Sequence, residues 1–276
     1  MKKLSKRAKL GACATVLVAA AAGISVNTAS AEAPQAHPSV AHPERDYMGS
    51  QVRLHMPKVK SIPPHLQDTV PGLDVSGWQG NVDWGTVAAN GAKFAYVKAT
   101  ESIDYTSDYF SQQYDGSYGA GIIRGAYHFA TPNTSSGADQ ANFFVDHGGG
   151  WSQDGMTLPG MLDIEWNPYG DTCYGLDQAS MAGWIADFSN TYQARTGRWP
   201  AIYTATSWWN QCVGDAGSGF GANSPLVIAN YNGSPGALPA GWDFQTIWQF
   251  ADSGTFPGDQ DQFNGDITRV QALANG

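Results

Sequence analysis

The stretch Met161-Leu162-Asp163-Ile164-Glu165-Trp166 is an apolar run of strand length that contains two acids. Turn signals bound it, Pro159-Gly160 before it and Asn167-Pro168 after it. Because side chains alternate along a strand, Asp163 and Glu165 are predicted to point to one face. Two carboxyl groups on one face of a buried strand repel each other and lose solvation, so one should hold its proton more tightly. The pattern favours a catalytic strand over a salt-bridged or surface edge strand.

Strand-like and helix-like segments alternate on both sides of this stretch. The longest predicted helix has one apolar stripe, which contains Met181, Trp184, Ile185, Phe188 and Tyr192. Strands are predicted at 72–76, 94–99, 122–129, 161–166, 201–204, 225–229 and 246–250, and helices at 84–90, 108–118, 138–146 and 176–195. This alternation implies an α/β fold built from βα units, with a mostly parallel sheet.

The number of strands favours a single closed or nearly closed barrel over residues 68–276. An open doubly wound sheet is the alternative, but no G-x-G-x-x-G motif follows the first strand.

The first 31 residues have the pattern of a secretory signal peptide. Five basic residues precede an apolar stretch at 10–26, and Ala29-Ser30-Ala31 is a small-x-small cleavage site. We therefore expect a secreted, extracellular protein. Residues 32–67 hold six prolines and four of the six histidines without any helical or strand period, which indicates a pro-segment or flexible linker. The irregular spacing of these histidines favours a solvated segment over a metal site.

Charge and cysteine content exclude several functions for residues 68–276. This part has 21 Asp and Glu against six Lys and Arg, a net charge of −15, which disfavours nucleic acids and anionic membranes as partners. We expect a monomer. Once the signal peptide is removed, Cys173 and Cys212 remain, and an exported chain favours a disulfide between them over two free buried thiols.

Metal and nucleophile motifs are absent from the same part of the sequence. His128 and His147 are its only histidines and lack the spacing of a zinc site, and no G-x-S-x-G elbow occurs. His128 alone is more often a hydrogen-bonded core residue than a catalyst. We expect no metal and no cofactor.

Polar or aromatic residues stand at the end of nearly every predicted strand. They include Asp74, Lys98, Glu101, Tyr127, Asp163, Glu165, Tyr203, Asn230, Trp248 and Gln249. In α/β barrels the C-terminal ends of the strands form the active site. Carboxyl groups flanked by aromatic rings are the equipment for cleaving a glycosidic bond, because one carboxyl protonates the leaving oxygen and the rings stack on sugars.

Five motifs in order resemble glycoside hydrolase family 25, the Chalaropsis-type lysozymes. They lie at 73–84, 94–101, 125–129, 162–165 and 247–250. The resemblance implies a flattened, irregular, TIM-like β/α barrel whose last strands lack full helices. It also implies an N-acetylmuramidase that cleaves the β-1,4 bond between N-acetylmuramic acid and N-acetylglucosamine, with peptidoglycan glycan strands as its partner.

The resemblance also implies roles for individual residues. The acid/base glutamate of the family falls on Glu165, its partner aspartate on Asp163 and the first-strand aspartate on Asp74. A fourth acid falls on Asp259 or, with the gap placed otherwise, on Asp261. Substrate contacts are expected from Trp78, Lys98, Glu101, Tyr127, Tyr203, Asn230, Trp248 and Gln249.

Two other functions compete with this hypothesis. One is a glycan-binding barrel without activity, which the presence of all three of Asp74, Asp163 and Glu165 disfavours. The other is a chitinase-type hydrolase of family 18 character, whose D-x-x-D-x-D-x-E strand this chain lacks. The sequence leaves open whether the anomeric configuration is retained or inverted.

Overall fold

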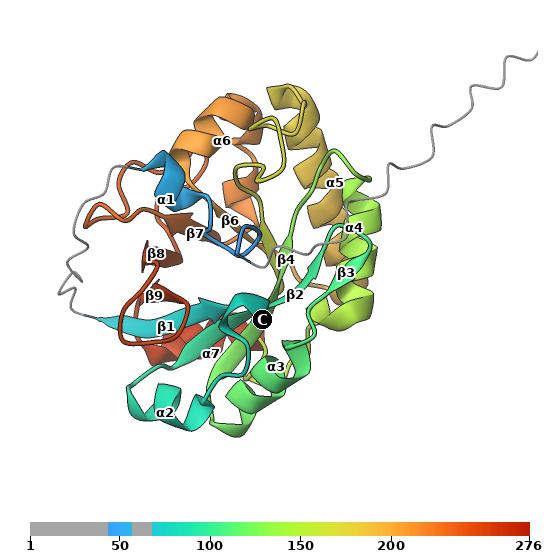
Figure 1. The fold of residues 1–276 in the computed structure, drawn as a ribbon. Coiled ribbons are helices and arrows are strands. Elements are labelled where there is room, and N and C mark those ends of the chain that lie inside the picture. The colour runs from blue at the N-terminus through green and yellow to red at the C-terminus, as the bar shows by residue number, and fades with distance from the viewer. Residues whose placement is uncertain (1–43, 57–67) are drawn as a thin grey trace, which may run out of the picture. The chain divides into compact units, whose positions relative to one another are not determined.

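The computed structural model describes residues 44–56 and 68–276, and the strands in this part of the chain form one barrel (Figure 1). In order around the barrel they are β1 (Thr69–Val75), β2 (Phe94–Glu101), β4 (Ile123–Phe129), β5 (Met161–Asp163), β6 (Ala201–Thr204), β7 (Leu226–Ala229), β8 (Ile247–Ala251) and β9 (Asp259–Asn264). Pairing of β1 with both β2 and β9 closes the ring. The predicted barrel is confirmed, and the open doubly wound sheet is wrong.

The barrel strands run parallel except for β9, which is antiparallel to both of its neighbours. The two-residue strand β3 (Tyr105–Thr106) pairs with the end of β2 outside the ring. Because parallel strands end on the same side, their C-terminal ends gather at one opening, which we call the mouth. In this register Asp163 lies opposite Phe129 and Tyr203, and Asp74 lies opposite Asp259.

Helices cover the outside of the barrel over most of its circumference (Figure 1). They are α2 (Trp84–Ala89), α3 (Phe110–Gly119), α4 (Gly137–Phe144), α5 (Gln178–Thr196), α6 (Thr206–Cys212) and α7 (Ile267–Asn275). No helix lies between β7 and β8 or between β8 and β9 in the described residues, so the predicted incomplete ring of helices is confirmed. Within 44–56 and 68–276, no helix is both long and apolar enough to cross a bilayer.

The longest helix, α5, begins and ends at recognisable signals. The Asp177 side chain accepts a hydrogen bond from the backbone N–H of Ser180, and Gly197 closes the helix in the left-handed conformation. All five residues of the predicted apolar stripe are buried, which confirms that prediction. Aromatic rings join α4 to α5, because Phe144 and Phe188 lie 6.3 Å apart between ring centroids.

The predicted disulfide is present. Cys173 and Cys212 are bonded across 39 positions of sequence, so the alternative of two free thiols is wrong. The bond ties the loop before α5 to the last turn of α6.

Several elements differ from the prediction. The central strand ends at Asp163 rather than at 166, because its neighbour β4 ends at Phe129, the residue opposite Asp163. Glu165 therefore lies two residues beyond the strand, although it is as buried as Asp163. The sequence reading also missed β3, β9, α6 and α7.

Residues 44–56 also differ from the expectation of an unpacked linker. They include a short helix, α1 (Val52–His55), and the side chains of Met48 and Val52 are buried. The predicted signal peptide and the rest of the predicted pro-segment lie outside the described residues.

Candidate active site

Five carboxyl groups meet inside the mouth of the barrel. Asp74 is the last residue but one of β1, Asp163 ends β5, Glu165 follows β5, and Asp259 and Asp261 lie on β9. Each of the five residues is at most 2 % exposed. The alternation of β9 turns both of its acids inward, where a purely structural strand would place apolar side chains.

The amide of Gln249, on β8, links several of these groups. Its Nε2 donates to Asp74 Oδ2 at 2.8 Å and to Asp259 Oδ2 at 3.1 Å. Its Oε1 accepts from the hydroxyl groups of Tyr203 at 2.7 Å and Tyr231 at 2.8 Å. Of the two candidates for the fourth acid, Asp259 is therefore the one joined to Asp74 through Gln249.

Asp163 and Glu165 have unused hydrogen-bonding capacity. Both oxygens of Asp163 and Oε2 of Glu165 are buried and have no hydrogen-bond partner among the described residues. A buried carboxyl oxygen without a hydrogen-bond partner lowers the stability of the folded protein, so its presence needs an explanation. A catalytic site offers one, because such an oxygen can bind a reacting group or carry a proton.

Burial makes these acids hold their protons. It raises the pKa of Glu165 to about 8, and the nearby charge of Asp74 adds to the effect. Burial also raises the pKa of Asp74 to about 7, while its hydrogen bond from Gln249 opposes the rise. For Asp163 the pKa is raised well above its ordinary value by burial first and then by the charge of Glu165. A protonated carboxyl group at neutral pH is what a general acid needs.

A second polar cluster lies at the end of β2. Lys98 Nζ donates to Glu101 Oε2 at 2.7 Å, and both side chains are at most 1 % exposed. The hydroxyl group of Tyr169, in the loop after β5, donates to Glu101 Oε1 at 3.0 Å. Burial raises the pKa of Glu101 to about 7, against the lowering effect of Lys98. The buried Lys98–Glu101 pair adds a fixed cation beside the five acids.

Comparison with known proteins agrees with this geometry. The model of "Glycosyl hydrolases family 25" matches residues 73–259. The chain belongs to this family.

Relatives and solved structures extend the match over the whole barrel. Lysozyme M1 of Streptomyces globisporus is 45 % identical over 271 residues, covering 94 % of this chain and 92 % of the relative. N,O-diacetylmuramidase of Chalaropsis sp. is 47 % identical, covering 75 % of this chain and all of the relative. The structure of a muramidase from Acremonium alcalophilum is 54 % identical, with a TM-score of 0.73, covering 75 % of this chain and 99 % of that one.

The predicted substrate residues of this family 25 barrel fall into two groups. Lys98, Glu101, Tyr127, Tyr203 and Gln249 are buried in the mouth beside the acids. The other three have different surroundings.

The side chains of Trp78, Trp248 and Asn230 differ from those five in exposure or in their hydrogen bonds. Trp78 is 54 % exposed on the short turn after β1. The indole of Trp248 is 1 % exposed and donates to the backbone carbonyl of Asn230 at 2.7 Å, so its ring presents no open face for stacking here. The amide of Asn230 bonds within its own loop, donating to Pro235 O and accepting from Asn232 N.

Tyr169 and Gly49 of the mouth were not predicted from the sequence. Tyr169 lies in a loop without a periodic pattern, and Gly49 belongs to the segment predicted to be a linker. Tyr231 stands among the polar and aromatic residues just after the strand predicted at 225–229, but the sequence assigned it no role.

The histidine of β4 is a core residue, as expected. His128 bonds to Thr100 Oγ1 at 2.8 Å and to Gln140 Oε1 at 2.9 Å, and burial lowers its pKa to about 3. In residues 44–56 and 68–276, no group of three His, Cys, Asp or Glu side chains is arranged to hold a metal ion.

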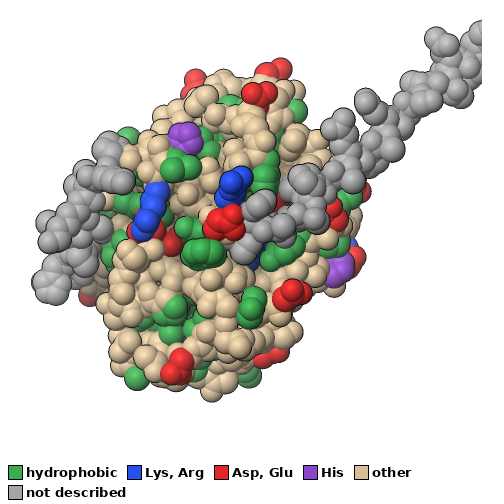
Figure 2. Space-filling model, in the orientation of Figure 1, with side chains coloured by type: hydrophobic (Ala, Val, Ile, Leu, Met, Phe, Trp, Pro, Cys, Tyr) green, Lys and Arg blue, Asp and Glu red, His purple; other side chains and the backbone are tan. Residues whose placement is uncertain are grey.

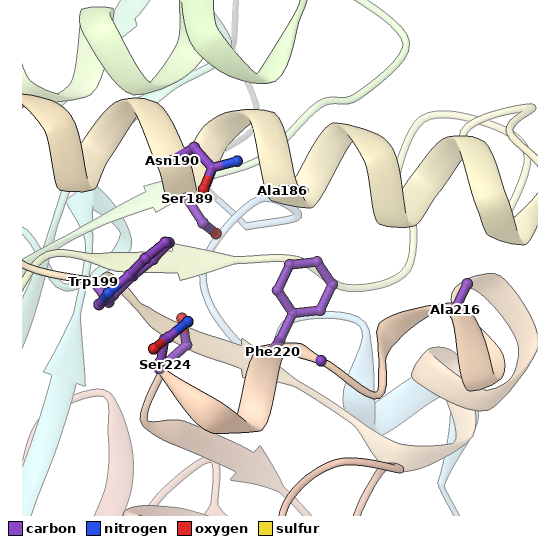
Figure 3. Close-up of a pocket in the computed structure, with 9 residues that line it drawn as sticks. Ala186, Ser189, Asn190, Trp199, Ala216, Phe220 and Ser224 are labelled. Atoms are coloured by element: carbon purple, nitrogen blue, oxygen red, sulfur yellow. The ribbon is translucent and has the colours of Figure 1, made fainter.

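A small surface pocket of about 210 Å³ lies apart from these acids (Figure 3). It lies between α5 and the turn that holds Phe220, with Ser189, Asn190 and Trp199 along its wall. Its lining residues carry no ionisable group, so it offers no acid or base for hydrolysis.

Proposed function

We propose that the protein is a secreted N-acetylmuramidase that cleaves the β-1,4 bond between N-acetylmuramic acid and N-acetylglucosamine in peptidoglycan. The observation that carries the proposal is the adjacent pair Asp163 and Glu165, with three buried oxygens free of hydrogen bonds among the described residues. The named activities of the family 25 relatives, lysozyme and diacetylmuramidase, support the same substrate.

Glu165 acts as the general acid in this proposal. Its raised pKa keeps the carboxyl group protonated at neutral pH, so that it can give its proton to the glycosidic oxygen as the bond breaks. The leaving N-acetylglucosamine takes that proton on its 4-oxygen, and positive charge develops at the anomeric carbon of the muramic acid residue. Nearby carboxylates stabilise this charge once they are ionised.

Asp163 completes the reaction in one of two ways. Once it is ionised, it orients the 2-acetamido group of muramic acid, whose carbonyl oxygen attacks the anomeric carbon to give a cyclic intermediate that water then opens, or it acts as a base on a water molecule that attacks directly. The first route retains the anomeric configuration and the second inverts it. We favour the acetamido route, because the substrate supplies that group next to a carboxylate with two unused oxygens. Asp74 and Asp259, joined through Gln249, form the opposite wall.

Secretion is the part of the proposal that rests on the sequence. The basic, apolar and small-residue pattern of residues 1–31 supports export, and the Cys173–Cys212 bond fits an oxidising compartment.

The test is Glu165→Gln, assayed on purified cell walls beside the parent enzyme. The amide is nearly isosteric but has no proton to transfer, so hydrolysis should fall by roughly 10²–10⁴-fold while wall binding and circular dichroism stay unchanged. A variant that lyses walls at more than about a tenth of the parent rate would exclude Glu165 as the acid. A parent that binds walls without releasing reducing sugar would favour the glycan-binding alternative, and one that cleaves chitin but not walls would favour the chitinase alternative.

A further inference from the structure

Residues 44–56 lie across the mouth of the barrel and contact the proposed acid directly. The backbone N–H of Gly49 donates to Glu165 Oε1 at 2.8 Å, and that of Met48 donates to the hydroxyl oxygen of Tyr127 at 3.2 Å. Figure 1 shows this blue segment and α1 beside the ends of β6, β7 and β8. We refer to residues 44–56 as the plug.

The plug also occupies the Lys98 cluster. Lys98 Nζ donates to the backbone carbonyl of Asp46 and, at 3.1 Å, to its Oδ1. The hydroxyl group of Tyr169 lies 3.0 Å from Asp46 Oδ2. Asp46 itself is only 2 % exposed, so this acid of the plug is buried against the cation expected to contact substrate.

Gly49 fits a space that no larger residue could enter. Its φ is +83°, and a Cβ atom there would lie 2.6 Å from the Tyr231 hydroxyl oxygen, 2.7 Å from Asp259 Oδ2 and 2.7 Å from Gln249 Oε1. These three groups are held by their own hydrogen bonds and cannot all move aside. The plug backbone therefore passes through the point where the predicted substrate and acid residues converge.

The C-terminal end of the plug is anchored at the rim. The ring of His55 stacks on that of Trp166, with centroids 4.5 Å apart and planes 4° from parallel. Arg53 forms an ion pair with Asp252, in the loop after β8. Figure 2 shows basic, acidic and apolar side chains gathered over the centre of this face.

Together these contacts are incompatible with a bound glycan strand. The five carboxyl groups are at most 2 % exposed, whereas a polymer must reach two of them from outside. The backbone N–H of Gly49 is hydrogen-bonded to Glu165 Oε1, so the backbone of the plug lies against the carboxyl group that a glycosidic oxygen would have to reach. We propose that the plug holds the enzyme latent by occupying the glycan site, and that its release opens the mouth. This inference rests on the proposed muramidase function.

The first test uses two glycine variants of the full chain. Gly49→Ala places a Cβ atom against three buried side chains, so it should displace the plug and raise wall lysis. Gly121→Ala is the matched control, because its φ is +77° and nothing lies within 4 Å of the added atom. It follows α3, before β4, at the end of the barrel away from the mouth. If the plug is closed in about nine molecules of ten, only about a tenth of the enzyme is active, so complete release should raise wall lysis about tenfold. We expect a gain of that order for Gly49→Ala and no gain for Gly121→Ala.

The second test removes the plug. A specific protease recognition sequence replaces part of 57–67 in the full chain, and lysis is measured before cleavage and after gel filtration of the cleaved protein. A synthetic peptide of residues 44–56 is then added back, with the same peptide carrying Gly49→Ala as its control. The expected result is a rise of about tenfold on cleavage, reversed by the first peptide and not by the second.

The outcomes separate this inference from the proposed function. Equal activity before and after cleavage, with no effect of the peptide, would overturn the latency and leave the muramidase standing. Absence of activity in every form would overturn the proposed function. Calorimetry would then measure whether the 44–56 peptide binds the cleaved barrel, which tests whether the plug occupies the mouth. Binding of the 44–56 peptide but not of its Gly49→Ala form would support occlusion, and no binding of either would overturn it.

Discussion

Asp74 and Glu165 affect each other across the mouth of the barrel, although neither lies near the other in the sequence. The charge of Asp74 is one of the causes that raise the pKa of Glu165, after burial. Burial raises the pKa of Asp74 to about 7 and that of Glu165 to about 8, so the two carboxyl groups lose their protons in the same range of pH. A substitution at Asp74 should therefore change the pH at which Glu165 loses its proton, and with it the pH dependence of hydrolysis.

Asp74→Asn should move the alkaline limb of the kcat/KM profile to lower pH. Removing a negative charge makes deprotonation of Glu165 easier, so the acid form needed for catalysis is lost earlier as pH rises. The measurement is kcat/KM on soluble wall fragments from pH 4 to 10. Asp215→Asn, an exposed carboxylate on a remote turn, is the control and should leave the limb in place. A limb that stays or rises in Asp74→Asn would show that Asp74 does not act on the acid electrostatically.

Individual site residues were predictable where they lay within a segment that has the sequence pattern of a strand. Asp163 and Glu165 stood out because alternation assigns both to one face of an otherwise apolar stretch. Tyr169 and Gly49 do not lie in a periodic pattern. One is a tyrosine in a loop and the other a glycine in a proline-rich segment, so the sequence does not indicate that either is buried. Their positions depend on contacts made across more than 60 residues of sequence.

Among the elements, β9 shows why the last part of the barrel escaped prediction. Its sequence, Asp259 to Asn264, has acids on the inward face and glutamines outward, the reverse of the usual apolar alternation. The inward face is polar because it lines the candidate active site. A prediction that relies on alternating apolar residues therefore cannot detect this strand. The apolar strands β2, β4 and β7 were found close to their observed bounds for the opposite reason.

The disulfide is expected to stabilise the elements around α5. Replacing Cys173 and Cys212 together by serine frees a loop of 39 residues in the unfolded chain, which should cost about 3–4 kcal/mol of unfolding free energy in the chain-entropy model. Urea unfolding of the parent and the double variant measures the difference. Reduction of the parent should reproduce the loss, and a double variant as stable as the parent would show that the bond constrains little.

For the whole molecule, the buried acids predict lower stability in alkaline solution. Glu165 has a pKa of about 8 in the folded protein against 4.5 ordinarily, and Asp74 and Glu101 each have one of about 7. A raised pKa means that the folded state binds the proton more tightly. Its contribution is complete below pH 4.5 and is lost as pH rises through the folded pKa.

The free energy of unfolding should therefore fall between about pH 5 and pH 8. Urea titrations across this range measure it, and Glu165→Gln, which carries no titrating proton, should show a shallower fall than the parent. Constant or rising stability over the same interval would contradict the assignment of protonated, buried carboxyl groups.

The overall architecture was predictable because a barrel follows from the number and alternation of its strands. The position of residues 44–56 was not, because the segment is held by two backbone N–H groups, a buried acid and two separated apolar side chains, Met48 and Val52, which form no periodic pattern. Its contacts also make the activity of the whole chain depend on a segment that the barrel does not need for closure.

The central claim is that the barrel cleaves peptidoglycan on the reducing side of N-acetylmuramic acid with Glu165 as its acid. The most direct measurement digests purified walls, reduces the products with borohydride and identifies the new ends by mass spectrometry. We predict that the new ends are muramitol, formed by the parent with its plug released and not by Glu165→Gln in the same state. New ends consisting of glucosaminitol, or muramitol formed equally by the variant, would contradict the account.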